Sequence, residues 1–329
     1  MKKTLCTLLA ILMATSMISC RKQAAPETSV TQEKPAESKT ESENNVPKEP
    51  KNYTLVCIPS NFMDDGTQDG NEYPESLVDN VTIRYQHKDT VLTSFGTTSE
   101  YSNTALESAK KLTIDGKTYD YTLQTSTANE WSKSESPLSQ KYAFHDTYMS
   151  DNPKTELMIN STTKKISFYF DYDVERGKDG DIGEDAIVKR ADQLLIELFG
   201  EKYLNDYTRS VAVHEPSRND RKYYVMYMKC FGEYLSEDWV RFTFNPKGEL
   251  TGINARSLGL MEDFDFTKEE LDDAKEAMYS SVYSDPAEWP TESAIGLVVD
   301  GLTGTCYMET YVFSYNGKEV EWRLLLALN

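Results

Sequence analysis

Short apolar runs separated by polar turns dominate the pattern of the chain, and they predict a strand-rich protein. Strand-length runs, many with apolar residues at every second position, predict β-strands at 53–59, 81–86, 90–95, 111–116, 117–123, 155–159, 165–171, 210–214, 223–231, 239–244, 250–255, 294–299, 306–313 and 320–328. The dipeptide Asp115-Gly116 lies between two of these runs. Because this pair readily adopts the left-handed backbone of a two-residue turn, it predicts a β-hairpin.

Two segments instead place apolar residues three or four positions apart, which is typical of an amphipathic helix. The first is 184–199, whose apolar face consists of Ile187, Ala191, Leu194, Leu195 and Leu198. Gly200 follows it and predicts its C-terminal end. The second helix is expected over 267–283. There Thr267 and Glu270 have the spacing of a capping box, in which each side chain binds the other residue's backbone N–H.

The N-terminus has the pattern of an export signal. Lys2 and Lys3 precede an apolar stretch, Leu5 to Met17, that is too short to span a bilayer between polar flanks. Met17-Ile18-Ser19-Cys20 then resembles the lipobox of bacterial lipoproteins. The resemblance implies that the Cys20 thiol is acylated, that residues 1–19 are removed, and that the lipid anchors the chain. The alternative is an ordinary signal peptide with a chance cysteine.

The two predicted helices and the strands after them align at a single offset of 83 residues. The matched pairs are Ala191–Ala274, Leu195–Met278, Phe199–Val282, Tyr224–Tyr307, Trp239–Trp322 and Phe242–Leu325. The agreement indicates a duplicated unit of one helix and three or four antiparallel strands, although two unrelated α+β segments can share a spacing by chance.

The sequence therefore predicts an α+β fold, with a strand-rich N-terminal region followed by two helix-plus-antiparallel-sheet units. The predicted parts are a signal peptide at 1–19, a lipidated tether at 20–52, a β-rich region at 53–155, a first unit at 156–258 and a second at 259–329. The tether carries four prolines and no aromatic residue, so it cannot bury a core and is expected to be disordered.

The first unit has a recognisable order of motifs. After the helix come Tyr223-x-Val225-x-Tyr227, then Trp239-Val-Arg-Phe-Thr-Phe, then Asn245-Pro-Lys-Gly248 followed by Glu-Leu-x-Gly-Ile253. Over 155–329 this order resembles the PepSY and YcdB-like group of envelope proteins. The resemblance implies cystatin-like modules, in which a helix packs in the curl of an antiparallel sheet, that are exported and non-catalytic, some thought to restrain peptidases. It supplies no site residue. The turn at 162–166 is similar to that group's turn but lacks its glycine.

Charge narrows the range of partners. The chain has 35 basic and 54 acidic residues, a net charge of −19. Without Lys2, Lys3 and the neutral tether, 53–329 keeps 27 basic and 48 acidic residues, a net charge of −21. Nucleic acid and anionic membrane surfaces repel such a protein. The expected partners are the membrane, through the lipid at Cys20, and an extracytoplasmic protein, peptide or glycan. The expected location is the outer side of a bacterial cell membrane, or the outer membrane of a Gram-negative cell.

Metal ligands are sparse. His87, His145 and His214 are far apart, and Pro216 interrupts any helical pair of histidines after His214. The acidic run 64–72 has calcium-like oxygens, but position 12 counted from Asp65 is Ser76 rather than a bidentate glutamate. Asp179-Gly-Asp181 with Glu184-Asp185 is a weaker match. Solvated loops are the favoured interpretation of both, and neither a metal nor another cofactor is expected.

Candidates for covalent catalysis are equally weak. The segments 108–111 and 161–164 match Ser-x-x-Lys, and 150–152 matches Ser-Asp-Asn of penicillin-binding enzymes. The lysine strand of those enzymes lies far downstream, whereas here Lys154-Thr155-Glu156 follows almost at once and lacks the glycine. After export, three cysteines remain, Cys57, Cys230 and Cys306, in strand-like apolar runs; one disulfide among them is possible. No catalytic residue is assigned.

Aromatic residues are the other notable feature. On 223–231, Tyr223, Val225 and Tyr227 face one side, and the alternate residues Tyr224, Met226 and Met228 face the other. Either both sides are core, which is favoured, or one side is an exposed platform suited to sugars or extended peptides. The leading prediction is a membrane-anchored binding or regulatory module without enzyme activity. A carbohydrate- or solute-binding lipoprotein is the alternative, and an envelope hydrolase comes third.

Overall fold

The computed structural model describes residues 51–59, 76–85, 107–128, 144–160, 164–174, 177, 180–217, 220–256, 258–289, 295–300, 304–315 and 318–328. The chain divides into two compact units, 1–51 and 52–329, and every described helix and strand belongs to the second. The signal peptide at 1–19, Cys20 and nearly all of the tether at 20–52 lie outside the described residues, as does the strand expected at 90–95.

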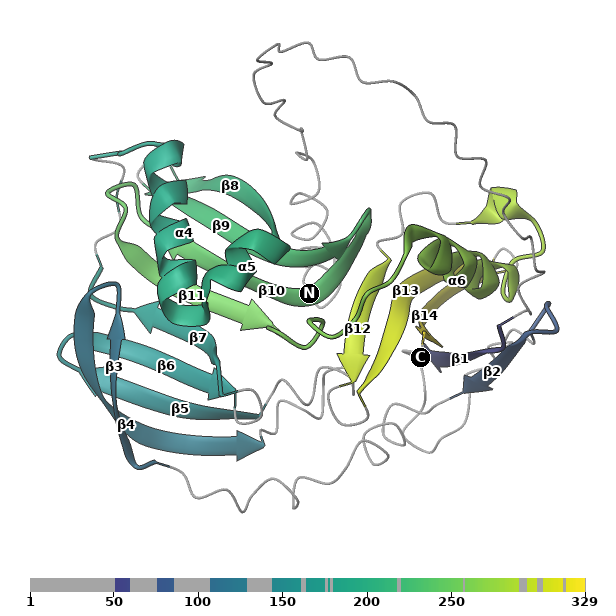
Figure 1. Ribbon diagram of the computed structural model, residues 1–329, viewed down its shortest axis with the longest axis horizontal. Helices are drawn as coiled ribbons and strands as arrows, with labels where there is room; N and C mark the ends of the chain where they lie inside the picture. The colour runs from purple at the N-terminus through teal and green to yellow at the C-terminus, as the bar shows by residue number, and fades with distance from the viewer. Residues whose placement is uncertain are drawn as a thin grey trace, which may run out of the picture. The chain divides into compact units, whose positions relative to one another are not determined.

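The α+β class is confirmed: the described residues contain fourteen strands in one mixed sheet and three α-helices (Figure 1). The strands are β1 (Tyr53–Pro59), β2 (Val81–Tyr85), β3 (Ala109–Ile114), β4 (Lys117–Ala128), β5 (Phe144–Asp151), β6 (Lys154–Asn160), β7 (Ile166–Asp171), β8 (Thr208–Ser217), β9 (Asp220–Phe231), β10 (Tyr234–Phe244), β11 (Leu250–Arg256), β12 (Gly296–Asp300), β13 (Thr305–Tyr315) and β14 (Lys318–Ala327). The helices are α4 (Glu184–Phe199), α5 (Glu201–Asp206) and α6 (Lys268–Ser280), with a 3₁₀ turn, η5 (Pro286–Glu288).

The sheet is continuous, and the predicted separation into a β-rich region and two separate units is wrong. Its order is β2-β1-β14-β13-β12-β10-β11-β7-β6-β5-β4-β3, with β9 on the other side of β10 and β8 beyond β9. β12 pairs with β10 across the boundary expected at 258/259, and β6 pairs with β5 across the one at 155/156. β1 pairs with β14 at the far end of the chain. Pairing partners this distant leave no mark on local periodicity.

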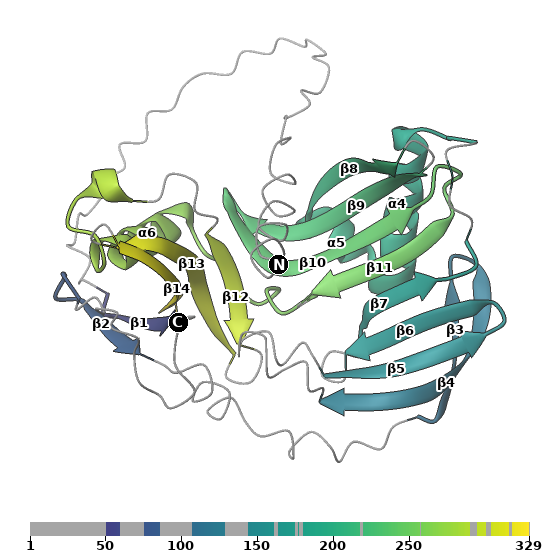
Figure 2. The same cartoon turned by 180° about the vertical axis from the view of Figure 1, so that it is seen from behind.

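All three α-helices lie on one face of the sheet, in front of the strands in Figure 1 and behind them in Figure 2. Alternation along β10 supports this. Val240 and Phe242 are buried in a first core with α4, and Tyr234, also at an even position, is buried in a second core with α6. The first core collects residues of α4, α5 and β3–β7 with β9–β11. The second collects residues of α6 with β1, β2 and β12–β14.

The predicted hairpin turn, capping box and helix end are all found in the structure. Asp115 and Gly116 have φ of 53° and 71° and connect β3 to β4. Thr267 and Glu270 form the capping box of α6, and Gly200 ends α4. Three elements were not predicted: β5, α5, which begins directly after Gly200, and the 3₁₀ turn η5. Short length or polar composition hides each of them from a periodicity argument.

The 83-residue offset matches core residues of α4 with core residues of α6, and core residues of β9 with those of β13, but it fails between β10 and β14. It carries the buried residues Ala191 and Leu195 of α4 onto the buried Ala274 and Met278 of α6. It also carries Tyr223 and Val225 of β9 onto Cys306 and Met308 of β13, all of them core residues. In β14, however, Trp322, Leu324 and Leu326 face the second core, so the match of Trp239 with Trp322 joins residues on opposite faces.

Candidate functional site

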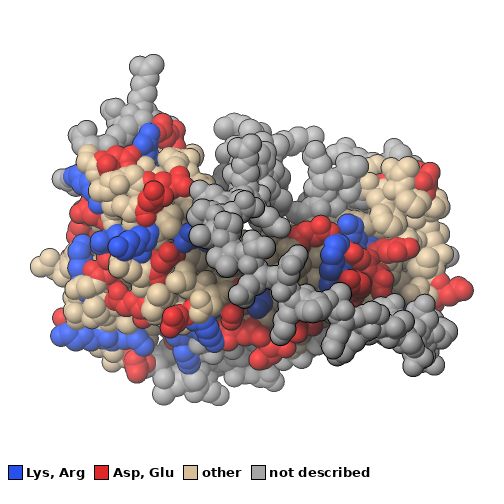
Figure 3. All heavy atoms as spheres, turned by 45° about the horizontal axis from the view of Figure 1, so that its top comes forward, with Lys and Arg blue, Asp and Glu red and all other residues tan. Residues whose placement is uncertain are grey.

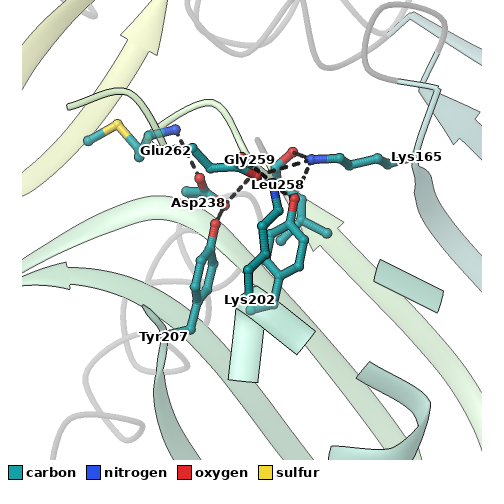
Figure 4. Close-up of polar contacts among 9 residues, drawn as sticks. Lys165, Lys202, Tyr207, Asp238, Leu258, Gly259 and Glu262 are labelled. Atoms are coloured by element: carbon teal, nitrogen blue, oxygen red, sulfur yellow. Dashed lines mark hydrogen bonds and ion pairs between the residues drawn. The ribbon is translucent and has the colours of Figure 1, made fainter. Parts of the chain in front are cut away.

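A cluster of polar side chains lies where β10 changes its neighbour (Figure 4). At Leu235 and Ser236, β10 pairs with β12, and from Trp239 onward it pairs with β11. The register between β9 and β10 also shifts between Leu235 and Trp239. Asp238 lies inside this irregular stretch on the buried face of β10, where its side chain binds the chain that leaves β11.

Asp238 is fully buried and accepts three hydrogen bonds. Its Oδ1 accepts from the backbone N–H of Gly259 at 2.9 Å and from the Tyr207 hydroxyl at 2.7 Å, and its Oδ2 accepts from the N–H of Met261 at 2.9 Å. Burial raises the pKa of Asp238 to about 6, although the hydrogen bonds and the charge of Lys165 act in the opposite direction. Asp238 thereby fixes the turn 258–262 against β10.

Glu262, at the end of that turn, forms the second half of the cluster. It accepts a hydrogen bond from the Tyr203 hydroxyl at 2.5 Å and forms ion pairs with Lys202 and, at 3.4 Å, with Lys165. Lys165 also donates to the Tyr203 hydroxyl and to the Leu258 carbonyl. Burial opposes ionisation of Glu262, but the donors of Lys202 and Tyr203 and the charge of Lys165 outweigh it and lower its pKa. The start of β7, helix α5 and the turn are thus tied together.

Gly259 is the residue that permits this close approach. Its φ is +86°, a conformation that other residues rarely adopt. A Cβ at this position would lie 2.5 Å from Glu262 Oε1 and 2.9 Å from the Tyr203 hydroxyl, and closer still to Lys165 Nζ. We call Lys165, Lys202, Tyr203, Tyr207, Asp238, Gly259 and Glu262 the junction cluster. It lies between Leu258 of the first core and Met261 of the second.

The junction cluster has a structural role: its side chains bind the turn 258–262 to β10, to α5 and to the start of β7. A buried carboxyl group with a raised pKa is often a functional group, but both oxygens of Asp238 are bound by donors of the protein itself. Glu262 is likewise surrounded by two ammonium groups and a hydroxyl. None of these residues was predicted from the sequence as part of a site. One signal was present: alternation along Tyr234, Ser236, Asp238, Val240 and Phe242 places Asp238 on the buried face.

Most of the residues considered for metal binding cannot be compared with the structure. The acidic run 64–72 and Asp179 lie outside the described residues. Asp181 accepts from the Gly183 N–H at 2.8 Å, from the Tyr223 hydroxyl at 2.9 Å and from Arg221 at 2.5 Å. These donors give Asp181 the environment of a hydrogen-bonded anion. Within the described part of the chain, no group of three or more His, Cys, Asp and Glu side chains is placed to hold a metal ion.

Among the serine and cysteine candidates, Ser161 lies outside the described residues. Ser108 directly precedes β3, as expected, and Lys111 on β3 is an exposed partner of Asp120. Cys57 and Cys306 are buried and Cys230 is half-buried; all three are free thiols, so the disulfide considered for them is not formed. Burial raises the pKa of both Cys57 and Cys306 to about 12, which makes them poor nucleophiles.

The second feature with functional potential is the sheet face opposite the described helices, which we call the outer face. Tyr223, Val225 and Tyr227 of β9 are buried in the first core, whereas the alternate residues on the outer face are only half-buried. Across β1, β12 and β14 this face carries a small buried cluster of Ile58, Val298 and Leu325. Its half-buried and exposed apolar side chains include those of β7 and the residue after it, β9, β10 and β13: Phe168, Phe170, Tyr172, Tyr224, Met226, Met228, Trp239, Tyr307, Tyr311 and Phe313. The two sides of β9 therefore differ: one is core and the other is partly open to solvent.

The outer face is most exposed on β13, where Tyr311 is 44% and Phe313 64% exposed. Their rings are nearly parallel, with an angle of 12° and centroids 6.4 Å apart. Beside them lies a buried ion pair, in which Arg323 Nε donates to Glu309 at 2.5 Å. This part of the outer face therefore offers flat aromatic surface next to a buried ion pair. Figure 3 shows a different surface, the helix side of Figure 1 with its top tilted forward, and on it basic side chains are interspersed with acidic ones.

Comparisons of the chain with protein families, with curated proteins and with solved structures find no match. Among the helices that the structure describes, none combines the length and the apolar character needed to cross a bilayer.

Proposed function

We propose that this chain is a lipid-anchored extracytoplasmic module that binds an extended peptide or a protein partner on its outer face and does not transform it. The lipobox resemblance at Met17 to Cys20 supports the anchor. The net charge of −21 over 53–329 argues against nucleic acid as the partner. The location that follows is the extracytoplasmic side of a bacterial envelope membrane.

The observation that carries the proposal is the unequal covering of the sheet. All described α-helices lie on one face, and the other retains aromatic and methionine side chains, of which Tyr172, Tyr311 and Phe313 are 44–64% exposed. Exposed apolar surface of this kind is costly in water and is typical of interaction sites. Aromatic side chains are also the residues most often central to binding energy.

The organisation of the fold supports a module built by duplication. We infer one PepSY-like unit from α4 with β8–β10 and another from α6 with β12–β14, each helix packing on its own part of the sheet. The family resemblance implies non-catalytic modules. The saturation of Asp238 and Glu262 by donors of the protein agrees with that, because a general acid or base must exchange its proton with a substrate.

A second candidate ligand is a glycan. The rings of Tyr311 and Phe313 are inclined by only 12°, and so are those of Phe168 and Phe170. Flat, parallel rings suit the apolar faces of sugars as well as they suit peptide side chains.

The decisive experiment is photo-cross-linking in intact cells with the double variant Tyr311→Ser/Phe313→Ser. We expect the partner captured by the unmodified chain to be lost from the variant. Ile196→Ser is the matched control, since Ile196 is 42% exposed on α4, on the opposite face, and its loss should leave capture unchanged. Equal capture by all three chains would contradict the assignment of the outer face. Glycan rather than protein in the captured product would favour the second candidate.

The absence of catalysis is tested separately. Residues 52–329 should leave peptide, glycan and ester libraries unchanged. Turnover that disappears when one residue is replaced, while the fold is retained, would contradict the non-catalytic assignment without affecting the outer face as a binding site.

A further inference from the structure

Strand β8 is an edge of the sheet. It pairs with β9 from Thr208 to His214 and again at Ser217, and no described strand pairs with its other side (Figures 1 and 2). An open edge exposes a row of backbone donors and acceptors that can pair with another strand. The other two edges are β2, which has five residues, and β3, which carries Lys110 and Lys111. Short length and lysines are common protections of an edge, and β8, with ten residues and no lysine, has neither. Its own protections, Pro216 and the irregular register between His214 and Ser217, lie at its C-terminal end and leave the stretch from Thr208 to His214 regular.

The side chains of β8 indicate what an added strand would cover. Arg209, Val211 and Val213 lie opposite Tyr227, Val225 and Tyr223, whose side chains are in the first core, so these three face the helix side. Helix α4 packs over β9, and Val213 is left 46% exposed. A strand paired with β8 would therefore extend the sheet and cover half-exposed valine side chains.

The sequence of β8 is complementary to itself. In an antiparallel pair centred on Ala212, Val211 of one copy lies opposite Val213 of the other, and Arg209 lies opposite Glu215. Arg209 already binds Asp192 at 2.9 Å, and Glu215 already binds Arg221 at 2.5 Å. The pairing would join these two ion pairs into one row of alternating charge, Asp192, Arg209, Glu215 and Arg221. A register shifted by one residue would instead place the helix side of one copy beside the outer face of the other.

We propose that β8 pairs antiparallel with β8 of a second copy of this chain, with Ala212 on the two-fold axis. The interface is isologous, as in most homodimers, and it keeps the α4 helices of both copies on the same side of the joined sheet. Charge complementarity between Arg209 and Glu215 selects a second copy over an unrelated strand. Binding on the outer face does not require this contact, so the two proposals can fail independently.

The first experiment uses Ala212→Cys in the full chain in isolated membranes. Residues directly opposite in antiparallel strands have Cα atoms about 4.5–5.5 Å apart, within the range of a disulfide. Mild oxidation should link most of the protein as a dimer. Thr82→Cys, on the exposed side of edge strand β2, is the matched control, and the unmodified chain shows the background from Cys57, Cys230 and Cys306. A yield for Ala212→Cys no greater than these controls would overturn the proposal, as would cross-linking mainly to another protein.

The second experiment tests the register. In the Ala212→Cys background, Arg209→Glu alone places two glutamates opposite each other, and Glu215→Arg alone places two arginines opposite each other. When the two variants are co-expressed, a mixed dimer of one Arg209→Glu chain and one Glu215→Arg chain again places opposite charges at both 209–215 contacts. The effect of each substitution within its own chain is the same in mixed and like dimers, so only the contact between chains differs. An exposed ion pair alters an equilibrium by up to about fivefold. Mixed dimers should therefore exceed the statistical ratio of two mixed to one of each like dimer. A statistical ratio would overturn the Arg209–Glu215 pairing.

Discussion

The backbone N–H of Met261 donates to Oδ2 of Asp238 at 2.9 Å, in a site from which solvent is excluded. One carboxylate thus holds the start of the chain segment that leads to α6, at the point where β10 exchanges β12 for β11. The strength of this attachment depends on protonation and on the space left by Gly259, and both can be tested.

Replacing Gly259 with alanine should lower the free energy of unfolding by about 2–5 kcal/mol. The left-handed backbone costs a Cβ-bearing residue about 1–2 kcal/mol, and the clash with Lys165, Tyr203 and Glu262 adds an overpacking cost. Gly232→Ala is the control, because Gly232 has φ of +63° but nothing within 4 Å of its Cβ position. Urea unfolding of residues 52–329 measures both. Equal losses would show that the junction cluster adjusts to the methyl group.

The stability contributed by Asp238 should fall as pH rises. Burial raises its pKa from 3.8 to about 6, so between these values the folded state binds more protons than the unfolded state. Its contribution is complete below pH 3.8 and is lost as pH rises through 6. The difference amounts to about 3 kcal/mol. The free energy of unfolding of the unmodified protein, relative to Asp238→Asn, should decrease by about that much between pH 4 and pH 7. Parallel pH profiles for the two proteins would refute the prediction.

Features set by neighbouring residues could be predicted from the sequence, and features set by distant residues could not. The turn at Asp115-Gly116 and the capping box at Thr267 follow from neighbouring residues, and both are found as predicted. For β9, core on both sides was the favoured interpretation, whereas the structure buries one side of the strand and leaves the other half-buried. The pairing of β1 with β14 and of β10 with β12 could not be predicted, because periodicity says which residues are buried but not against which strand. The junction cluster was missed for the same reason: Asp238 binds residues 21 and 23 positions away.

Removing one partner of the buried ion pair of Glu309 and Arg323 should destabilise the protein more than removing both. Both side chains are 8% exposed, and Arg323 Nη1 has no hydrogen-bond partner among the residues that the structure describes. Arg323→Met leaves the Glu309 carboxylate buried without its cation, which should destabilise the protein by about 3–5 kcal/mol. The double variant Glu309→Met/Arg323→Met should recover most of that loss, since two apolar side chains can fill the space. Lys111→Met, at an exposed pair with Asp120, is the control and should have little effect. A double variant as unstable as the single one would contradict the argument.

Thiol reactivity should follow burial. Cys230 is half-buried, whereas Cys57 and Cys306 are buried in the second core with pKa values raised to about 12. The thiolate is the reactive form, so at pH 8 a water-soluble disulfide reagent should label Cys230 first. The other two thiols should react only when urea unfolds the protein. Rapid labelling of all three in the native protein would contradict the packing of β1 and β13 around α6.

The anchor prediction rests on Cys20. In the lipobox interpretation its thiol is the only attachment point, and acyl chains stabilise the membrane-bound state by about 0.8 kcal/mol per buried methylene. Cys20→Ser should therefore abolish acylation and move the chain to the soluble or unprocessed fraction of cells. Cys6→Ser is the matched control, because Cys6 lies in the segment that is removed and its loss should leave anchoring unchanged. Fractionation with mass measurement of the mature N-terminus distinguishes the outcomes. If the Cys20→Ser protein stays in the membrane with the processed mass of the unmodified protein, Cys20 is not the lipid site and the anchor must lie elsewhere.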